Sequence, residues 1–131
     1  MNKHRRLMLA ANLTGVLASV TLAWHVRAAD ADDAIKKVMK TYHKAPKGQD
    51  PVCKLAQDGK ATPEQLKQLV AGYETMTKSK PPRGDEAGWK EKTTALLTAA
   101  KALEKGTPGA AAKYKEAVNC KACHSLYKPE N

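Results

Sequence analysis

Apolar residues recur at helical spacing in four stretches of the chain, beginning near residue 30. In the first stretch they stand at i, i+3, i+4 and i+7, which is one face of a helix: Ile35, Val38, Met39 and Tyr42. The aspartates at its start suit a helix N-terminus because they can cap it and favour its dipole: Asp30, Asp32 and Asp33. The sequence Ala45-Pro46-Lys47-Gly48 ends the pattern. The stretch therefore predicts a first helix that stops before Pro46.

A second helix is predicted from residue 62, after a connector over residues 49–61 in which residues 51–57 make one or two turns. Thr62 is its expected N-cap, Pro63 fits the first helical position, and Gln65 completes a capping box. The face expected to be buried carries Leu66, Leu69, Val70, Tyr73 and Met76.

A third helix is predicted from Asp85 or Glu86 to about Glu104, after a break at residues 80–85. The break contains two prolines and a glycine, which cannot continue a helix, and we interpret it as a turn. The apolar stripe of this helix, with a threonine at its weak position, carries Trp89, Thr93, Leu96, Leu97, Ala100 and Leu103.

The fourth stretch begins at Thr107-Pro108, a second pairing of a cap residue with a proline, and predicts one helix from about Pro108 to Tyr127. Its expected inner side carries Tyr114, Ala117, Val118, Leu126 and the cysteine motif described below. No stretch alternates apolar and polar residues as a half-buried strand would. The expected fold class is therefore all-α, an antiparallel four-helix bundle.

The first 28 residues have the features of a secretory signal peptide. A basic start (Lys3, His4, Arg5 and Arg6) precedes an apolar run over residues 7–24, and Val26-Arg27-Ala28 offers small or apolar residues at the −3 and −1 positions of a cleavage site. We expect Sec-type export and cleavage after Ala28. Residues 29–131 would then form one periplasmic domain with no stable membrane anchor; an uncleaved anchor is the alternative.

The charge of this expected mature chain favours acidic protein partners over nucleic acid. Removing residues 1–28 takes four of the 23 basic residues and no acidic one, which leaves 19 against 13 and a net charge of +6. The basic residues are mostly scattered lysines and aromatic residues are scarce, so no nucleic-acid surface is expected. No enzyme is expected either, because the sequence shows no nucleophile–base pair, phosphate loop or carboxylate dyad.

Near the end of the chain, Cys120-Lys121-Ala122-Cys123-His124 forms a C-x-x-C-H motif, the attachment signature of a c-type haem. On a helix the two cysteines and the histidine are i, i+3 and i+4, so their side chains point to one face. The thiols can then bond to the haem vinyl groups while the imidazole binds the iron. One covalent haem c is the expected cofactor.

Pairs of the form C-x-x-C also occur in zinc sites and thiol redox centres. A thioredoxin-like motif needs a βαβ setting, which this sequence lacks. Zinc would need a fourth ligand such as His43, and a second closely spaced ligand pair is missing. The third cysteine, Cys53, is expected to be buried as a small apolar residue; a free thiol and an intermolecular bridge are the alternatives.

The place of the motif on the last helix, with seven residues after His124, resembles the class II cytochromes c, the cytochrome c-prime family of four-helix bundles. The resemblance covers residues 32–128 and rests on the motif, on Ser125-Leu126-Tyr127-Lys128 after it, and on the four-helix pattern. It implies a haem held by the C-terminal helix, with thioether links at Cys120 and Cys123 and His124 as the proximal iron ligand. A homodimer is compatible with the same resemblance.

The resemblance also directs attention to the first helix. In low-spin members of this superfamily, and in the related b-type four-helix cytochrome of the periplasm, a methionine of that helix is the distal iron ligand. Met39 resembles the ligand methionine of the b-type relative in position. High-spin members leave the sixth coordination position vacant behind an apolar side chain, but this sequence lacks the arginine common in their first helix. His43, four residues after Met39, is the alternative ligand, and Met76 is a further candidate.

These patterns lead to the hypothesis of a periplasmic mono-haem c-type cytochrome that carries single electrons between redox proteins. A five-coordinate haem protein that binds nitric oxide or carbon monoxide is the alternative. A third interpretation makes the domain one subunit of a larger redox complex.

Overall fold

The computed structural model describes residues 28–130, and over that range the secondary structure is entirely helical. The helices are α1 (Ala28–Tyr42), α2 (Val52–Gln57), α3 (Pro63–Lys78), α4 (Glu86–Glu104), α5 (Ala110–Ala117) and α6 (Cys120–Tyr127). Apart from Ala28, the predicted signal peptide lies outside the described residues. Between residues 28 and 130 there is no helix with the length and apolar content needed to cross a membrane.

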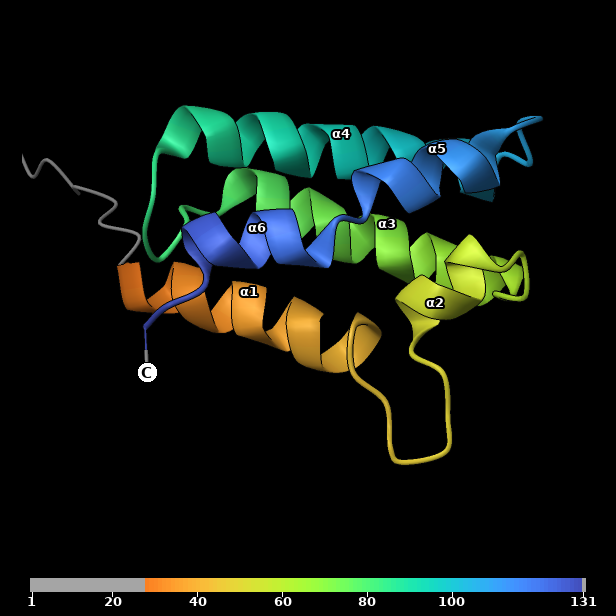
Figure 1. Cartoon of the computed structure of the whole chain (residues 1–131), viewed down its shortest axis with the longest axis horizontal. Helices are drawn as coiled ribbons and strands as arrows, with labels where there is room; N and C mark the ends of the chain where they lie inside the picture. Colours follow the sequence, from red (N-terminus) through yellow and green to blue (C-terminus); the bar gives the residue numbers. More distant parts are fainter. Residues whose placement is uncertain (1–27, 131) are drawn as a thin grey trace, which may run out of the picture.

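The long helices run back and forth along one axis (Figure 1). The chain runs one way in α1, returns in α3, runs forward again in α4, and returns through α5 and α6. The closely packed pairs in the described part are α3 with α4, α4 with α5, and α1 with α3, while the short α2 packs on α3 and α5. Helix α6 belongs to none of these close pairs and joins the core chiefly through Tyr127, whose ring packs on Trp89 of α4.

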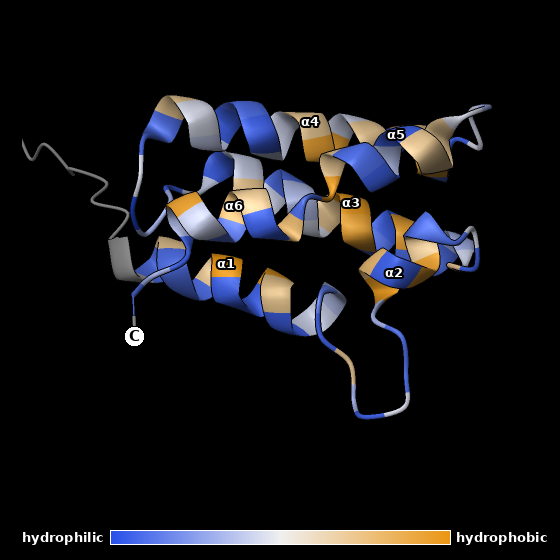
Figure 2. Ribbon diagram, viewed as in Figure 1, coloured by the Kyte–Doolittle hydropathy of each residue, from blue (hydrophilic) through white to orange (hydrophobic). Residues whose placement is uncertain are grey.

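One hydrophobic core joins all six helices. Apolar and polar residues recur along each helix, so that apolar stripes face inward (Figure 2). The most deeply buried members come from α2, α3, α4 and α5: Ala56, Leu69, Tyr73, Met76, Ala100 and Tyr114. Thr93 is 2% exposed, as expected for its place in the stripe, and its hydroxyl donates to the Trp89 carbonyl at 2.9 Å. This bond satisfies a buried polar group within its own helix.

The predicted start of α3 is confirmed atom by atom. The Thr62 hydroxyl accepts a hydrogen bond from the Gln65 backbone N–H at 3.2 Å, and the Gln65 side chain accepts from the Thr62 backbone N–H at 2.8 Å. Pro63 follows at the first helical position, where its missing N–H costs nothing. Because Pro63 has no N–H, three N–H groups at this helix end lack a helical partner, and local sequence satisfies two of them, those of Thr62 and Gln65.

Replacing Thr62 by Ala is expected to lower the free energy of unfolding by about 1 kcal/mol, because the capping oxygen is lost. The measurement is urea denaturation followed by far-ultraviolet circular dichroism. The matched control is Thr94→Ala, at an exposed position inside α4. That change should leave stability equal or slightly higher because alanine has the better helix propensity. Equal losses in the two variants would contradict the capping role.

Trp89, near the start of α4, closes the other end of α3. Its indole N–H donates to the carbonyl oxygens of Ser79 at 2.8 Å and Met76 at 3.1 Å. These carbonyls lie at the C-terminal end of α3, where the Met76 carbonyl also accepts a hydrogen bond from the Ser79 N–H at 3.2 Å. Because the ring is also buried at 3% exposure, Trp89 fixes the angle between α3 and α4.

The prediction of one continuous fourth helix from Pro108 to Tyr127 is wrong. Helix α5 ends at Ala117, Val118 and Asn119 have non-helical backbone angles, and α6 begins at Cys120. The break is stabilised by the Asn119 side chain, which accepts a hydrogen bond from the Ala122 N–H at 3.0 Å and so caps α6. A short polar side chain that bonds to the backbone competes with helix continuation, and here it prevails.

The predicted cap at Thr107 is also wrong. Thr107-Pro108-Gly109-Ala110 forms a turn closed by the Ala110 N–H and the Thr107 carbonyl at 3.1 Å. Gly109 has φ 74° and ψ 3°, the values that the third residue of a type II turn requires. Pro108 occupies the second turn position, and α5 starts only at Ala110.

The break changes which residue of α6 faces inward. Leu126 was expected on the inner side but is 50% exposed, whereas its neighbour Tyr127 is 3% exposed. Restarting the helix at Cys120 shifts the rotational phase of α6 relative to the stripe that Tyr114 and Val118 form on α5. Extending the apolar stripe of α5 through the break therefore predicts that Leu126 is buried, whereas the buried residue is Tyr127.

Candidate functional site

The cysteine motif occupies the first turns of α6. The Cys123 N–H donates to the Asn119 carbonyl at 3.1 Å, so the helical hydrogen bonds of α6 begin at its cap residue. Cys123 is half-buried, while Cys120 and His124 are exposed. Burial raises the pKa of the Cys123 thiol. The three side chains line one cavity, as their i, i+3 and i+4 positions require.

This cavity has a volume of about 940 Å³ and lies among α1, α4, α6 and the break before α6. Its apolar wall includes Ile35, Met76, Trp89, Leu96, Val118 and Tyr127. Ligand sites in proteins typically occupy roughly 300–1,000 Å³ and are lined mainly by apolar side chains with a few polar groups. The cavity therefore has the size and lining for one large, mostly apolar ligand.

Met39 and His43, the residues singled out on the first helix, line the same cavity. Met39 is half-buried in α1. His43 follows the last residue of α1, and its backbone N–H donates to the Met39 carbonyl at 3.1 Å, so the two side chains share one helical face. Met76 also reaches the cavity wall but is only 2% exposed. The structure thus brings the thiols and imidazole of α6 together with two candidate iron ligands from the first helix.

The imidazole of His43 is held neutral by its surroundings. Burial, and after it the charge of nearby His124, lower its pKa to about 4. The ordinary pKa of histidine is about 6.5, so His43 carries no charge at neutral pH. A neutral imidazole has one N–H and one lone pair.

His43 is also the end of a buried hydrogen-bond chain. Its Nε2 atom lies 3.1 Å from the Tyr73 hydroxyl oxygen, which lies 2.6 Å from the Tyr114 hydroxyl oxygen. Both tyrosines are 0% exposed and are the largest fully buried side chains in the described part of the protein. Burial raises the pKa of each phenol, so both keep their protons at neutral pH. The apolar stripes of the sequence predict Tyr73 and Tyr114 in the core, but no local pattern indicates this hydrogen-bond chain.

The C-terminal end of α6 is fixed by Tyr127. Its ring packs edge-on against Trp89, with centroids 5.3 Å apart and planes at 71°. It also lies over two glycines, and an added Cβ would stand 2.8 Å from its ring at Gly84 and 2.7 Å from its hydroxyl at Gly88. Gly84 also has φ 79°, which side chains rarely allow. The glycines permit the close approach that holds α6 over the start of α4.

Arg83 makes a second attachment to α6, although residues 80–85 were interpreted as a simple turn. One guanidinium nitrogen donates to the Ser125 carbonyl at 2.8 Å, and another lies 2.6 Å from a carboxylate oxygen of Glu130. The sequence gives only a weak indication of this contact, because an arginine in a loop is usually solvated. Residues 80–85 therefore connect α3 to α4 and also hold the helix that carries the motif.

Replacing Arg83 by Ala is expected to lower the free energy of unfolding by about 1 kcal/mol, because a charged donor to a backbone carbonyl is lost. Glu130→Ala is the control and should change stability by less than about 0.5 kcal/mol. The Glu130 side chain is 84% exposed, and exposed ion pairs contribute little. Both values come from urea denaturation. A larger loss for Glu130→Ala than for Arg83→Ala would contradict the importance of the carbonyl contact.

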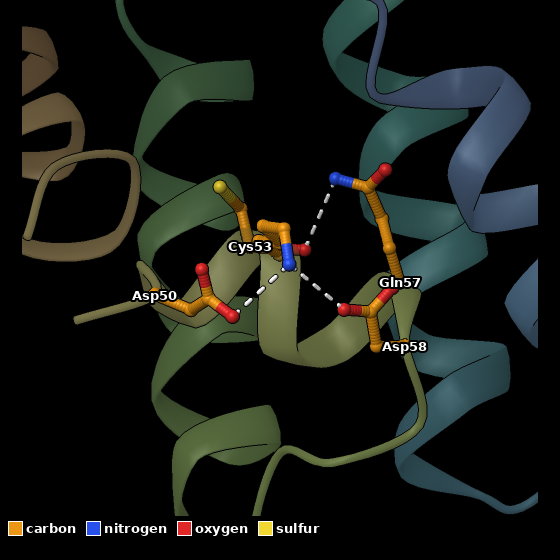
Figure 3. Close-up of polar contacts among 5 residues, drawn as sticks. Asp50, Cys53, Gln57 and Asp58 are labelled. Atoms are coloured by element: carbon orange, nitrogen blue, oxygen red, sulfur yellow. Dashed lines mark hydrogen bonds and ion pairs between the residues drawn. The ribbon is translucent and has the colours of Figure 1, made fainter. Parts of the chain in front are cut away.

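Cys53 is buried at 6% exposure, as predicted, and does not line the cavity. It belongs to α2. On the same helix, the Lys54 ammonium lies 3.0 Å from a carboxylate oxygen of Asp50, before the helix, and 3.1 Å from one of Asp58, after it (Figure 3). The Gln57 side chain donates to the Cys53 carbonyl at 3.4 Å. Burial, and after it the nearby Cys120, raise the pKa of its thiol. A buried, protonated thiol behaves as a small apolar side chain.

A covalent haem fits the donor set at this cavity. Two thiols and an imidazole stand on one helical face, a thioether from another helix reaches the same space, and the wall between them is largely apolar. In residues 28–130 no three His, Cys, Asp or Glu side chains are grouped so that they could hold a metal ion by themselves. No protein-family model, no curated protein and no solved structure matches this chain. The function of the site is therefore inferred from the chain's own residues.

Proposed function

We propose that this chain is an exported mono-haem c-type cytochrome that carries single electrons between redox proteins of the periplasm. The observation that carries the proposal is the meeting of Cys120, Cys123 and His124 of α6 with Met39 of α1 at one apolar cavity. The four passes of the chain, with α5 and α6 together as the last one, support a four-helix bundle as the architecture. Residues 1–28, with their signal-peptide pattern, support export.

The chain's own residues would hold the haem as follows. Each sulfur of Cys120 and Cys123 would bond to one carbon of a vinyl group, with the thiol proton passing to the other carbon, so that no further reactant is needed. His124 would supply a nitrogen to the iron, and Met39 would supply a sulfur. The haem, once bound, provides the reversible one-electron change between Fe(II) and Fe(III). The apolar side chains of the cavity would limit the contact of the site with water. This exclusion of water and the identity of the iron ligands together set the reduction potential.

The charge of the domain supports an acidic partner. Lys36 and Lys40 on α1, Lys44 just after it, and Lys92 on α4 line the cavity and are exposed. Lys36 is paired with Asp32, so its charge is partly compensated. The expected net charge of +6 on residues 29–131 has the same sign. The cavity lining also carries Asp32, Glu91, Glu116 and Glu130, so the net positive charge of the whole domain, rather than a basic rim, would favour encounter with an acidic protein. This effect weakens with added salt.

The test is the absorption spectrum of the purified exported protein in both oxidation states. A low-spin spectrum with the weak charge-transfer band of iron–methionine ligation is the expected result. Met39→Ala should abolish that band and lower the reduction potential, because a methionine ligand raises it. Met76→Ala is the control and should retain the band. A protein without bound haem after export would overturn the proposal.

One observation favours a second candidate, a five-coordinate haem protein that binds nitric oxide or carbon monoxide. Ile35, one turn before Met39, is 8% exposed and lines the same cavity. An apolar side chain of this kind could cover a vacant sixth coordination position. High-spin spectra in both oxidation states, with rapid uptake of carbon monoxide by the reduced protein, would select this candidate over electron transfer.

A further inference from the structure

The two ligand candidates on the first helix are not equivalent, because only one of them is already engaged. His43 Nε2 lies 3.1 Å from the Tyr73 hydroxyl, and Tyr73 is 0% exposed. The Met39 thioether requires no hydrogen bond, and the side chain is half-buried at the cavity wall. Which of the two side chains binds the iron therefore depends on whether the His43 imidazole can give up its hydrogen bond to Tyr73.

The hydrogen-bond chain of His43, Tyr73 and Tyr114 allows two arrangements of its protons, and neither leaves a free lone pair on His43 Nε2. If the Tyr73 hydroxyl donates to Nε2, the lone pair of that nitrogen accepts this bond. If Nε2 instead carries the proton and donates to Tyr73, it has no lone pair at all. The Tyr73–Tyr114 bond at 2.6 Å is compatible with both arrangements, because either hydroxyl can donate to the other. In neither arrangement can Nε2 bind a metal ion without losing its bond to Tyr73.

Breaking that bond is unfavourable for the protein as a whole. Tyr73 is a fully buried residue of α3, so water cannot replace the lost partner of its hydroxyl. The other ring nitrogen, Nδ1, is bonded to Cγ next to the Cβ substituent, so the main chain hinders its approach to a large planar ligand. Met39, four residues earlier on the same face, meets neither obstacle.

We propose that Tyr73 is a positioning residue that holds the His43 imidazole away from the haem iron and so leaves the sixth coordination position to Met39. This inference rests on the proposed function. Tyr73 itself touches no ligand: it does not line the cavity, and it acts only through His43.

The test compares Tyr73→Phe with the wild-type holoprotein by absorption and electron paramagnetic resonance spectra and by redox titration. We expect the variant to lose the iron–methionine band, to gain the spectrum of two histidine ligands, and to shift to a lower potential. Adding His43→Ala to Tyr73→Phe should restore the iron–methionine band. Tyr114→Phe is the matched control, since it removes a buried phenol hydroxyl from the same chain and leaves the Tyr73–His43 bond.

Several results would overturn the inference and leave a haem protein in place. They are a wild-type protein that already has two histidine ligands, a high-spin wild-type protein, or a Tyr73→Phe variant with an unchanged band. Wild-type protein without haem would overturn the proposed function together with the inference. If Tyr73→Phe does not fold, nitrogen NMR of histidine-labelled, reduced wild-type protein decides. A His43 Nε2 signal typical of a hydrogen-bonded nitrogen supports the inference, and one typical of an iron-bound nitrogen overturns it.

Discussion

Serine at both Cys120 and Cys123 is expected to remove covalently bound haem from the exported protein completely. The two thiols line one cavity from the first turns of α6, and no other cysteine lines that cavity. A hydroxyl does not add to a vinyl group as a thiol does, so both thioether bonds are lost. The measurement is the peroxidase stain of haem on a denaturing gel, together with the alkaline pyridine spectrum of the protein.

Cys53→Ala provides the matched control for this experiment. Cys53 is buried in α2 and does not line the cavity, and alanine keeps a small apolar side chain at that position. Haem staining should therefore remain at the wild-type level. Staining that persists in the Cys120/Cys123 double variant would refute covalent attachment by the motif. Loss of staining in Cys53→Ala alone would move the attachment site to α2.

Tyr127→Ala is expected to lower the free energy of unfolding by about 3–5 kcal/mol, the usual cost of truncating a large aromatic side chain in a core. The ring is 3% exposed, packs edge-on against Trp89, and covers Gly84 and Gly88. Its removal leaves a void and weakens the hold on the end of α6, which the contact of Arg83 with the Ser125 carbonyl would still retain. Urea denaturation followed by circular dichroism gives the loss.

Leu126→Ala distinguishes the observed packing from the packing expected on pattern alone. Leu126 is 50% exposed, so its truncation should cost less than about 0.5 kcal/mol. A bundle with one unbroken last helix would give a core-sized loss at Leu126. Losses of similar size at Leu126 and Tyr127 would therefore contradict the orientation of α6.

Local signals in the sequence were sufficient for most helix bounds. The capping box at Thr62 and the aspartate cap at Asp85 act within one turn of the chain, so they are visible without any tertiary contact. The stripe from Trp89 to Ala100 has helical periodicity because one side of α4 must be buried. The break at Asn119 also had a local signal, a preferred N-cap residue directly before the motif, but the stripe on either side obscured it.

The sequence by itself determined an all-helical chain, the capped start of α3, and the i, i+3, i+4 grouping of Cys120, Cys123 and His124. These features depend on neighbours within a few residues, so propensity, capping and periodicity define them. Only the tertiary structure decided that Tyr127 rather than Leu126 is buried and that Tyr73 engages His43. Those outcomes depend on how helices distant in sequence meet, and no local pattern encodes the rotation of one helix against another.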